Sequence, residues 1–250
     1  MIEVKHIYKS YDGNFVLNDV NVSFEQGKCN LIIGRSGSGK TVLLKSIVGL
    51  IEVDEGEIWY DTVKFSHMGT GSRQEIRKEM GMLFQGAALF DSLTVEENVV
   101  FPLNMLTSQS KAEKLDRANF CLDKVRVSGS NKLYPAELSG GMKKRVAIAR
   151  AIALNPRYLF CDEPNSGLDP ETAIVIDNLI KELTEEFNMT TIVNSHDMNS
   201  VLEIGDKVVF IYQGCKCWEG TRKEIFHTDN EALNNFVFAT NMARQIKKNQ

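Results

Sequence analysis

The sequence predicts an α/β fold built around one phosphate-binding loop. Residues 34–41 (GRSGSGKT) fit the pattern G-x-x-x-x-G-K-[ST]. Residues 29–33 before the loop predict a short buried strand, and apolar residues at helical spacing after it predict a helix that begins at Lys40. Two later apolar strands, at 158–163 and 189–194, also end in polar residues and alternate with helical segments. We expect a mixed sheet with these strands at its centre, helices on both faces and an antiparallel edge.

The loop carries the chemistry of a nucleotide-phosphate site. Its glycines allow backbone N–H groups to approach phosphate oxygens, and the following helix points its positive end at them. Lys40 is expected to bridge the β- and γ-phosphates, and the Thr41 hydroxyl to hold Mg²⁺. The residues predicted to bind the nucleotide here are Gly34, Ser36, Gly37, Ser38, Gly39, Lys40 and Thr41.

Composition limits the class of protein. The 250 residues are 43% hydrophobic and 25% charged, which is ordinary for a globular protein. The net charge of −4 argues against a broad nucleic-acid-binding surface. We find no apolar run near the roughly 20 residues that span a bilayer and no signal-peptide pattern, so we expect the chain in the cytosol. Five scattered cysteines, an odd number, predict free thiols in a reducing compartment.

The N-terminal third predicts antiparallel strands. Residues 2–27 form a meander with a turn after Tyr11, which on its own is interpreted as a half-buried turn aromatic. Residues 56–65 predict a hairpin, 69–71 a flexible link and 72–80 a short charged helix. Residues 82–85 predict a buried strand that ends in the amide of Gln85.

A mostly helical lobe is predicted at residues 86–154. Two capping boxes, Thr94 to Glu97 and Ser110 to Glu113, mark helix starts within it. Leu89, Phe90 and Phe101 are either its core or an apolar patch for another protein.

A second helix N-terminus lies within the lobe. Residues 138–142 (LSGGM) lead into a helix, so Ser139, Gly140 and Gly141 form a second potential anion site. Lys143, Lys144 and Arg145 are interpreted as a solvated face of that helix.

Polar residues end the two later strands. Asp162 is placed to help hold Mg²⁺, and Glu163 to act as general base on the attacking water. Asp169 caps the next helix, and His196 stands at the end of the following strand. Residues 208–218 predict a last hairpin, and 228–250 an amphipathic helix.

Taken together, these motifs resemble the ATP-binding-cassette (ABC) family over about residues 2–227, which makes 1–227 a nucleotide-binding domain and 228–250 an extension. The phosphate loop is similar to its Walker A, residues 158–163 to its Walker B and 138–142 to its signature. Gln85, Asp169 and His196 fall on its Q-loop, D-loop and switch histidine, and Tyr11 where the family stacks an aromatic on adenine. The resemblance implies ATP and Mg²⁺ as cofactors, with Mg²⁺ held by Thr41, Gln85 and Asp162. It assigns catalysis to Lys40, Gln85, Glu163 and His196.

The resemblance also implies partners. Two copies pack head to tail, so that Ser139, Gly140, Gly141 and Asp169 of one complete the ATP site of the other. Residues 85–99 and Met142 look like the ATPase subunit of Mla-type systems, which move phospholipid with an integral-membrane permease and an MCE-type lipid-binding protein. The expected location is the cytoplasmic face of the inner membrane, as a peripheral subunit without nucleic acid. Asn165 and Asn194 depart from the usual pattern without removing a catalytic group.

The sequence also allows a comparison of the transporter motor with other functions of related ATPases. A DNA-maintenance ATPase of the same superfamily needs a long coiled coil, and residues 42–157 contain no sustained heptads. A non-hydrolysing regulatory module is expected to lack Lys40, Glu163 or His196, and all three are present. An amino-acid or metal importer ATPase is the alternative within transporters, because the cargo is determined by the permease.

Overall fold

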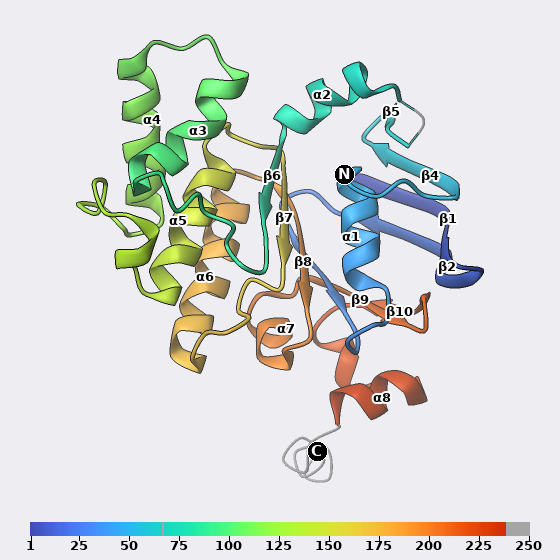
Figure 1. The fold of residues 1–250 in the computed structure, drawn as a ribbon. Coiled ribbons are helices and arrows are strands. Elements are labelled where there is room, and N and C mark those ends of the chain that lie inside the picture. The colour runs from blue at the N-terminus through green and yellow to red at the C-terminus, as the bar shows by residue number, and fades with distance from the viewer. Residues whose placement is uncertain (67, 239–250) are drawn as a thin grey trace.

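The computed structural model describes residues 1–66 and 68–238, which form two sheets with helices around them (Figure 1). The core sheet has the strand order β10-β9-β3-β8-β7-β6, and all neighbours in it are parallel except β10 and β9. The second sheet is antiparallel, in the order β2-β1-β4-β5. The strands are β1 (Ile2–Tyr11), β2 (Asn14–Phe24), β3 (Cys29–Ile33), β4 (Glu55–Tyr60), β5 (Val63–Lys64), β6 (Met80–Leu83), β7 (Tyr158–Asp162), β8 (Thr190–Ser195), β9 (Lys207–Tyr212) and β10 (Cys215–Gly220). The predicted α/β class is confirmed.

The helices cover both faces of the core sheet. They are α1 (Lys40–Val48), α2 (Thr70–Lys78), α3 (Val95–Leu106), α4 (Lys111–Lys124), α5 (Gly140–Ile152), α6 (Pro170–Glu186), α7 (Met198–Ile204) and α8 (Glu231–Val237), with short 3-10 turns at Pro135–Glu137 and Glu224–Phe226. Helix α1 packs between the two sheets, while α3, α4, α5 and α6 lie on the opposite face of the core sheet (Figure 1). No helix of the described residues is long and apolar enough to span a membrane.

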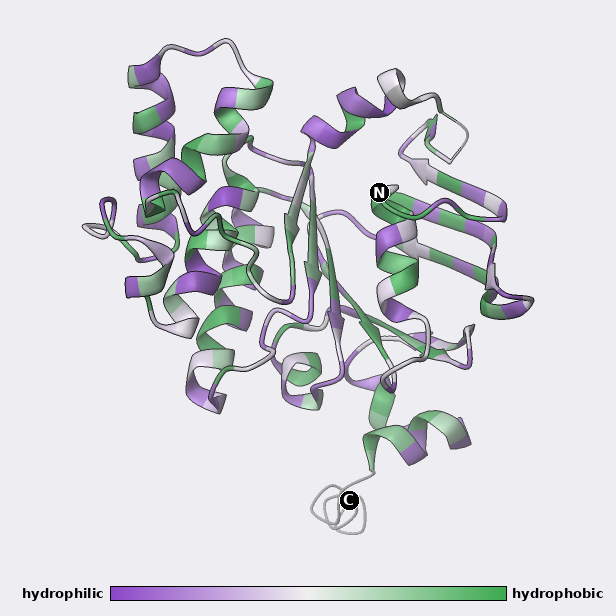
Figure 2. Ribbon diagram, in the orientation of Figure 1, coloured by the Kyte–Doolittle hydropathy of each residue, from purple (hydrophilic) through white to green (hydrophobic). Residues whose placement is uncertain are grey.

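The central strands are buried on both faces. Every residue of β3, β7 and β8 is buried, and Figure 2 shows these strands as largely hydrophobic. Alternation along β3 sends Ile32 toward α1 and Leu31 and Ile33 toward the helical lobe. Parallel strands covered on both sides by helices require such continuous apolar runs.

The helical lobe begins where its sequence caps predict. Thr94 and Ser110 each accept a hydrogen bond from the backbone N–H three residues on, and the glutamate there bonds back to the cap. Such caps satisfy N–H groups that the first turn leaves unpaired.

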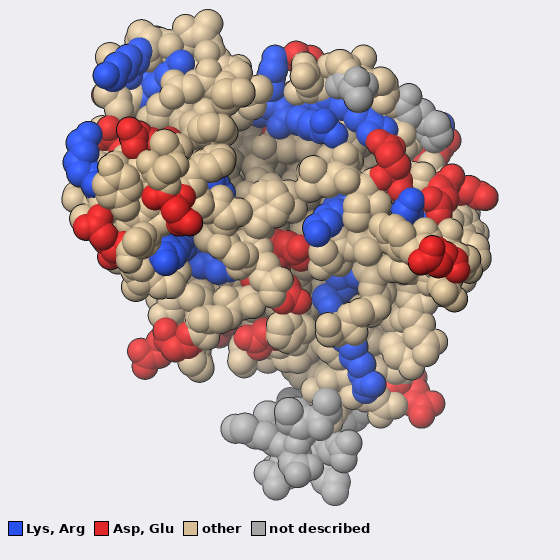
Figure 3. All heavy atoms as spheres, in the orientation of Figure 1, with Lys and Arg blue, Asp and Glu red and all other residues tan. Residues whose placement is uncertain are grey.

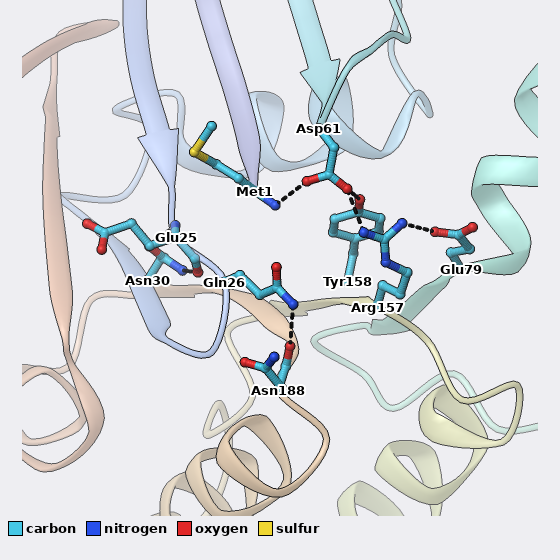
Figure 4. A network of polar contacts seen from close by, with 9 residues as sticks. All are labelled: Met1, Glu25, Gln26, Asn30, Asp61, Glu79, Arg157, Tyr158 and Asn188. Atoms are coloured by element: carbon cyan, nitrogen blue, oxygen red, sulfur yellow. Dashed lines mark hydrogen bonds and ion pairs between the residues drawn. The ribbon is translucent and has the colours of Figure 1, made fainter.

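The amino ends of the core strands are tied to the antiparallel sheet by a polar network (Figure 4). Asp61, directly after β4, accepts hydrogen bonds from Arg157 at 2.6 Å and from the Tyr158 hydroxyl at 2.8 Å. Arg157 also donates to Glu79, just before β6. These charges are paired with one another at the end of the sheet away from the phosphate loop.

Two predicted boundaries were wrong. The proposed link at 69–71 is the start of α2, with Gly69 as an extended N-cap and Gly71 inside the first turn. The strand predicted at 82–85 is β6, which ends at Leu83, so Gln85 lies in the loop beyond it. Within the helix predicted at 228–250, α8 lies at Glu231–Val237, and residues 239–250 lie outside the described part.

Candidate active site

The phosphate loop connects β3 to α1 at the carboxyl edge of the core sheet. Gly34 and Gly39 have φ values of 151° and 105°, and a Cβ at either would come within 2.3 or 2.6 Å of a backbone carbonyl oxygen. Glycine is therefore required at both by conformation and by space. Gly39 is the N-cap of α1, and no described side chain caps the helix there. Its first N–H groups are thus available to an anion.

Lys40 is buried inside this loop. Only 4% of the residue is exposed, and its Nζ donates to the carbonyl oxygens of Gly34 at 2.9 Å and Arg35 at 3.0 Å. Burial lowers the pKa of Lys40, while the nearby carboxylates of Glu163 and Asp162 favour its charged form. A cation held by neutral carbonyls in a glycine-rich loop is suited to a phosphate ligand.

Asp162, at the end of β7, meets the start of α1. Its Oδ1 accepts hydrogen bonds from the Thr41 hydroxyl at 3.2 Å and from the Asn194 amide at 3.0 Å. A hydroxyl and a carboxylate are oxygen ligands of the kind Mg²⁺ prefers. The donor set therefore fits this metal.

Glu163 follows directly and has an unusual backbone. Its φ is 46°, in the left-handed region that non-glycine residues rarely adopt, and its N–H donates to the Asn194 carbonyl at 3.0 Å. Such strain persists only where the surroundings fix it, and it concentrates at functional sites.

Two neighbouring side chains hold the Glu163 carboxylate. Gln85 donates to one oxygen at 3.1 Å, and the His196 ring nitrogen lies 3.2 Å from the other. The Glu163 side chain is 21% exposed and that of His196 is 61% exposed. The carboxylate is thus oriented and still open to water, as a general base must be.

One pocket joins these groups to the phosphate loop. Its lining combines loop residues with the catalytic candidate Glu163: Val16, Ser36, Gly37, Gly39, Lys40, Thr41, Val42 and Glu163. Lys40, Gln85, Asp162, Glu163 and His196 therefore gather at one edge of the sheet. Gln85 donates to Glu163 and Ser166, and among the described residues it makes no hydrogen bond to the Thr41–Asp162 pair.

The signature residues lie elsewhere. They begin α5, on the face of the core sheet opposite α1 (Figure 1). Ser139 caps its own helix, and a Cβ on Gly141 would come 2.6 Å from the Thr172 side chain. Asp169 caps α6 through the Thr172 N–H at 2.9 Å. None of these residues has a described contact with the phosphate loop.

Tyr11 stands at the turn between β1 and β2. It is 46% exposed, and the Lys9 ammonium lies 5.4 Å from its ring centre. It is not among the residues lining the phosphate pocket, although Val16 of β2 is.

Sequence reasoning missed several site neighbours. Asn194 bonds Asp162, Ser166 bonds Gln85, and Val16 lines the pocket. The prediction of a solvated face was wrong for Lys144, which is only 5% exposed. Helical spacing places Lys144 on the same face as the buried Ile148, and this signal was present in the sequence.

Comparison with known proteins decides the family. A family model described as ABC transporter matches residues 17–166, which is more than half of the chain. The chain belongs to the ABC transporter ATPase family. This ABC ATPase is 38% identical to the intermembrane phospholipid transport ATP-binding protein MlaF of Haemophilus influenzae, over 95% of the chain and 90% of MlaF. It is also 38% identical to the methionine import protein MetN of Clostridioides difficile, over 95% of the chain and 74% of MetN.

A solved structure supports the same fold. The ABC ATPase superposes on the dimeric structure of MJ0796, a bacterial ABC transporter cassette, with a TM-score of 0.81 and 33% identity. The match covers 89% of this chain and 99% of that one. A second MJ0796 structure is a dimer in a post-hydrolysis state bound to ADP and Pi. The chain is therefore an ATP-binding enzyme that hydrolyses ATP.

Proposed function

We propose that this ABC ATPase is the motor subunit of a transporter and hydrolyses ATP at the site built on residues 34–41. The observation that carries the proposal is the orientation of Glu163 between Gln85 and His196, at the rim of the pocket that holds Lys40. A chain that only bound nucleotide would have no need of a strained, oriented carboxylate there.

Each side chain has a proposed role. Lys40 binds the β- and γ-phosphates, and Thr41 and Asp162 hold Mg²⁺, with Gln85 as a further oxygen donor. The metal, when bound, neutralises phosphate charge. Glu163 accepts a proton from the attacking water, while His196 and Gln85 keep its carboxylate aimed.

The site is proposed to be completed by a second copy. Ser139 and Gly141 begin a helix on the other side of the sheet from Lys40 of their own chain, so they would serve the nucleotide of a head-to-tail partner. Asp169, which caps α6 beside them, would lie in the same interface. The dimeric state of the related MJ0796 supports this arrangement.

A groove next to the active site is the proposed seat of the permease. It has a volume of about 480 Å³ and is lined mostly by apolar residues from β6, α3, α5 and the loop after β6, together with Arg77 and Arg150. Figure 3 shows a hollow between the helical lobe and α2, with basic side chains along its upper rim. The rings of Phe90 and Phe101 lie 4.6 Å apart within the lining. Leu89, predicted to join them, packs against the core instead.

Such a groove suits a short amphipathic helix. Burial of each large apolar side chain is worth roughly 1.5–3 kcal/mol, so two or three anchors would hold a cytoplasmic helix of an integral-membrane permease. We propose that closure of the ATPase pair moves both grooves and thereby drives the permease from the cytoplasmic face of the inner membrane. Nucleic acid has no proposed part.

Phospholipid is the proposed cargo, delivered with an MCE-type lipid-binding protein. Similarity to MlaF over 90% of its length supports this proposal. The equal identity to MetN makes amino-acid import the second candidate.

Purification from gently solubilised membranes, with mass spectrometry of both proteins and lipids, tests the proposal. We expect a permease, an MCE-type protein and phospholipid. Phe90→Asp should release them and leave ATP binding intact, whereas Phe120→Asp should not, because Phe120 is similarly exposed but lies outside the groove. Recovery of an amino-acid receptor would favour the importer, and recovery of DNA-bound partners would overturn the transporter function.

A further inference from the structure

The loop after β6 is held by cations of the signature helix. Lys144 of α5 donates from Nζ to the carbonyl oxygen of Gln85. Arg150, also on α5, donates to the carbonyl oxygens of Ala87 at 2.9 Å and Ala88 at 2.7 Å. Three carbonyls within four residues of one loop are therefore bound by a single helix.

The backbone of this loop is strained. Ala87 and Ala88 have φ values of 63° and 50°, so two consecutive non-glycine residues occupy the left-handed region. Such strained residues persist only where the surrounding structure fixes them. Arg150 binds the carbonyls of these two residues, and Lys144 binds the carbonyl at the start of the strained segment.

Lys144 is the more unusual of the two cations. It is 5% exposed, and among the described residues the Gln85 carbonyl is its one hydrogen-bond acceptor. A buried ammonium is costly without compensating partners. Burial lowers the pKa of Lys144, and the negative charges of Glu163 and Asp162 are among the groups that favour its charged form. The same two carboxylates favour the charged forms of Lys144 and Lys40.

Gln85 connects Lys144 to the proposed general base through its backbone and its side chain. The backbone carbonyl of Gln85 accepts from Lys144, and its side-chain Nε2 donates to Glu163 at 3.1 Å. A displacement of the backbone at Gln85 would move that amide away from the carboxylate.

We propose that Lys144 is a positioning residue of the ATPase, which holds the backbone of Gln85 so that its amide keeps Glu163 aimed at the water. This inference rests on the roles proposed above for Gln85 and Glu163. Ser139 is the N-cap of the same helix. Helix α5 therefore connects two proposed features: the surface that faces the partner's nucleotide, and the general base of its own chain.

The first test compares turnover with ATP binding. Lys144→Met keeps the apolar stem and removes the donor and its charge. We expect kcat to fall about 10- to 100-fold, the scale of a misplacement near 1 Å, with the ATP dissociation constant changed less than about twofold. Lys144→Arg should restore much of the rate. The exposed Lys111, changed to Met, is the control and should leave turnover unaltered. Thermal unfolding confirms that each variant is folded.

A double-mutant cycle with Gln85→Ala separates positioning from a general structural role. If Lys144 acts through Gln85, adding Lys144→Met to Gln85→Ala should cost less than about a further twofold, because the effects of coupled residues do not add. Full multiplication of the two losses would overturn the inference. Lys144→Leu, which also lacks the donor, supplies the same cycle if Lys144→Met fails to fold.

The single variants distinguish failure of the inference from failure of the proposed function. Turnover at the wild-type rate in Gln85→Ala would overturn the role proposed for Gln85 itself. A slow Gln85→Ala beside a Lys144→Met of wild-type rate would overturn the positioning role of Lys144 alone.

Discussion

Two glycine-bearing helix starts, at α1 and α5, differ in what surrounds them. At α1, Gly39 leaves the first N–H groups without a side-chain cap, and Lys40 lies buried beside two carboxylates. At α5, Ser139 accepts the Met142 N–H at 3.3 Å, so the helix caps itself. Both starts offer a positive dipole end, but only α1 is surrounded by groups able to do chemistry. The positive end of a helix can attract an anion, but it becomes a reactive site only where catalytic side chains converge on it.

This difference assigns the two starts to different steps. The α1 start should govern nucleotide binding within each chain, whereas the α5 start should matter only when two chains meet to complete the site. Variants at each should therefore separate hydrolysis, binding and association.

The largest effect is expected at the general base. Glu163→Gln keeps the shape of the side chain and removes the proton acceptor, so hydrolysis should fall by about 10²–10⁴ while ATP binding persists. The variant should accumulate as an ATP-bound dimer on size-exclusion chromatography. Loss of ATP binding together with activity would show that Glu163 maintains the pocket and is not the base.

Next in size is the loss of the buried cation. Lys40→Ala removes a charge that faces phosphate, and hydrogen bonds to charged groups are worth about 1.5–3 kcal/mol, so ATP affinity should fall about 10- to 150-fold. Isothermal titration of the variant against Lys45→Ala, on the same helix, provides the comparison. Unaltered affinity in Lys40→Ala would contradict its assignment to the phosphates.

The contrast between α1 and α5 also marks how far the sequence could predict the site. The phosphate loop was predictable because its strand, glycines and lysine are contiguous in the chain, and capping boxes fixed the starts of α3 and α4 in the same local way. The contact of Gln85 with Glu163 joins residues 78 positions apart, so it follows only from the order of β6, β7 and β8 in the sheet.

The errors have different causes. Gly69 and Gly71 suggested a link, but α2 begins there, with Gly69 as an extended N-cap that has no capping side chain. Lys144 was placed in solvent because lysine is rarely buried, although a loop carbonyl accepts its hydrogen bond and two carboxylates favour its charged form. Tertiary contacts overrode the usual preference of Lys144, whereas the start of α2 is a local feature of the chain.

A charge at the start of α5 should affect association alone. Ser139→Asp keeps a good N-cap but would place a carboxylate against the partner's γ-phosphate, and like charges across an interface cost on the order of a few kcal/mol. In the Glu163→Gln background, we expect the ATP-dependent dimer to weaken tenfold or more, while ATP binding to the monomer is retained. Ser139→Asn, an equally good cap without charge, should weaken it less. A dimer indifferent to Ser139→Asp would refute the head-to-tail arrangement.

The smallest effect is expected at Tyr11. It decides whether the site at α1 binds ATP through its phosphates alone or through its adenine as well. Tyr11 is 46% exposed on the β1–β2 turn, where its ring is open to a ligand. Stacking on adenine is worth about 0.5–1.5 kcal/mol, so Tyr11→Ala should weaken ATP by that amount while Tyr11→Phe retains affinity. Phe15→Ala serves as the control, since Phe15 is an exposed aromatic of the same hairpin. Tripolyphosphate, which lacks a base, should bind Tyr11→Ala as well as it binds the unmodified chain. An equal loss for tripolyphosphate and ATP would mean that Tyr11 supports the fold of the hairpin and does not contact the nucleotide.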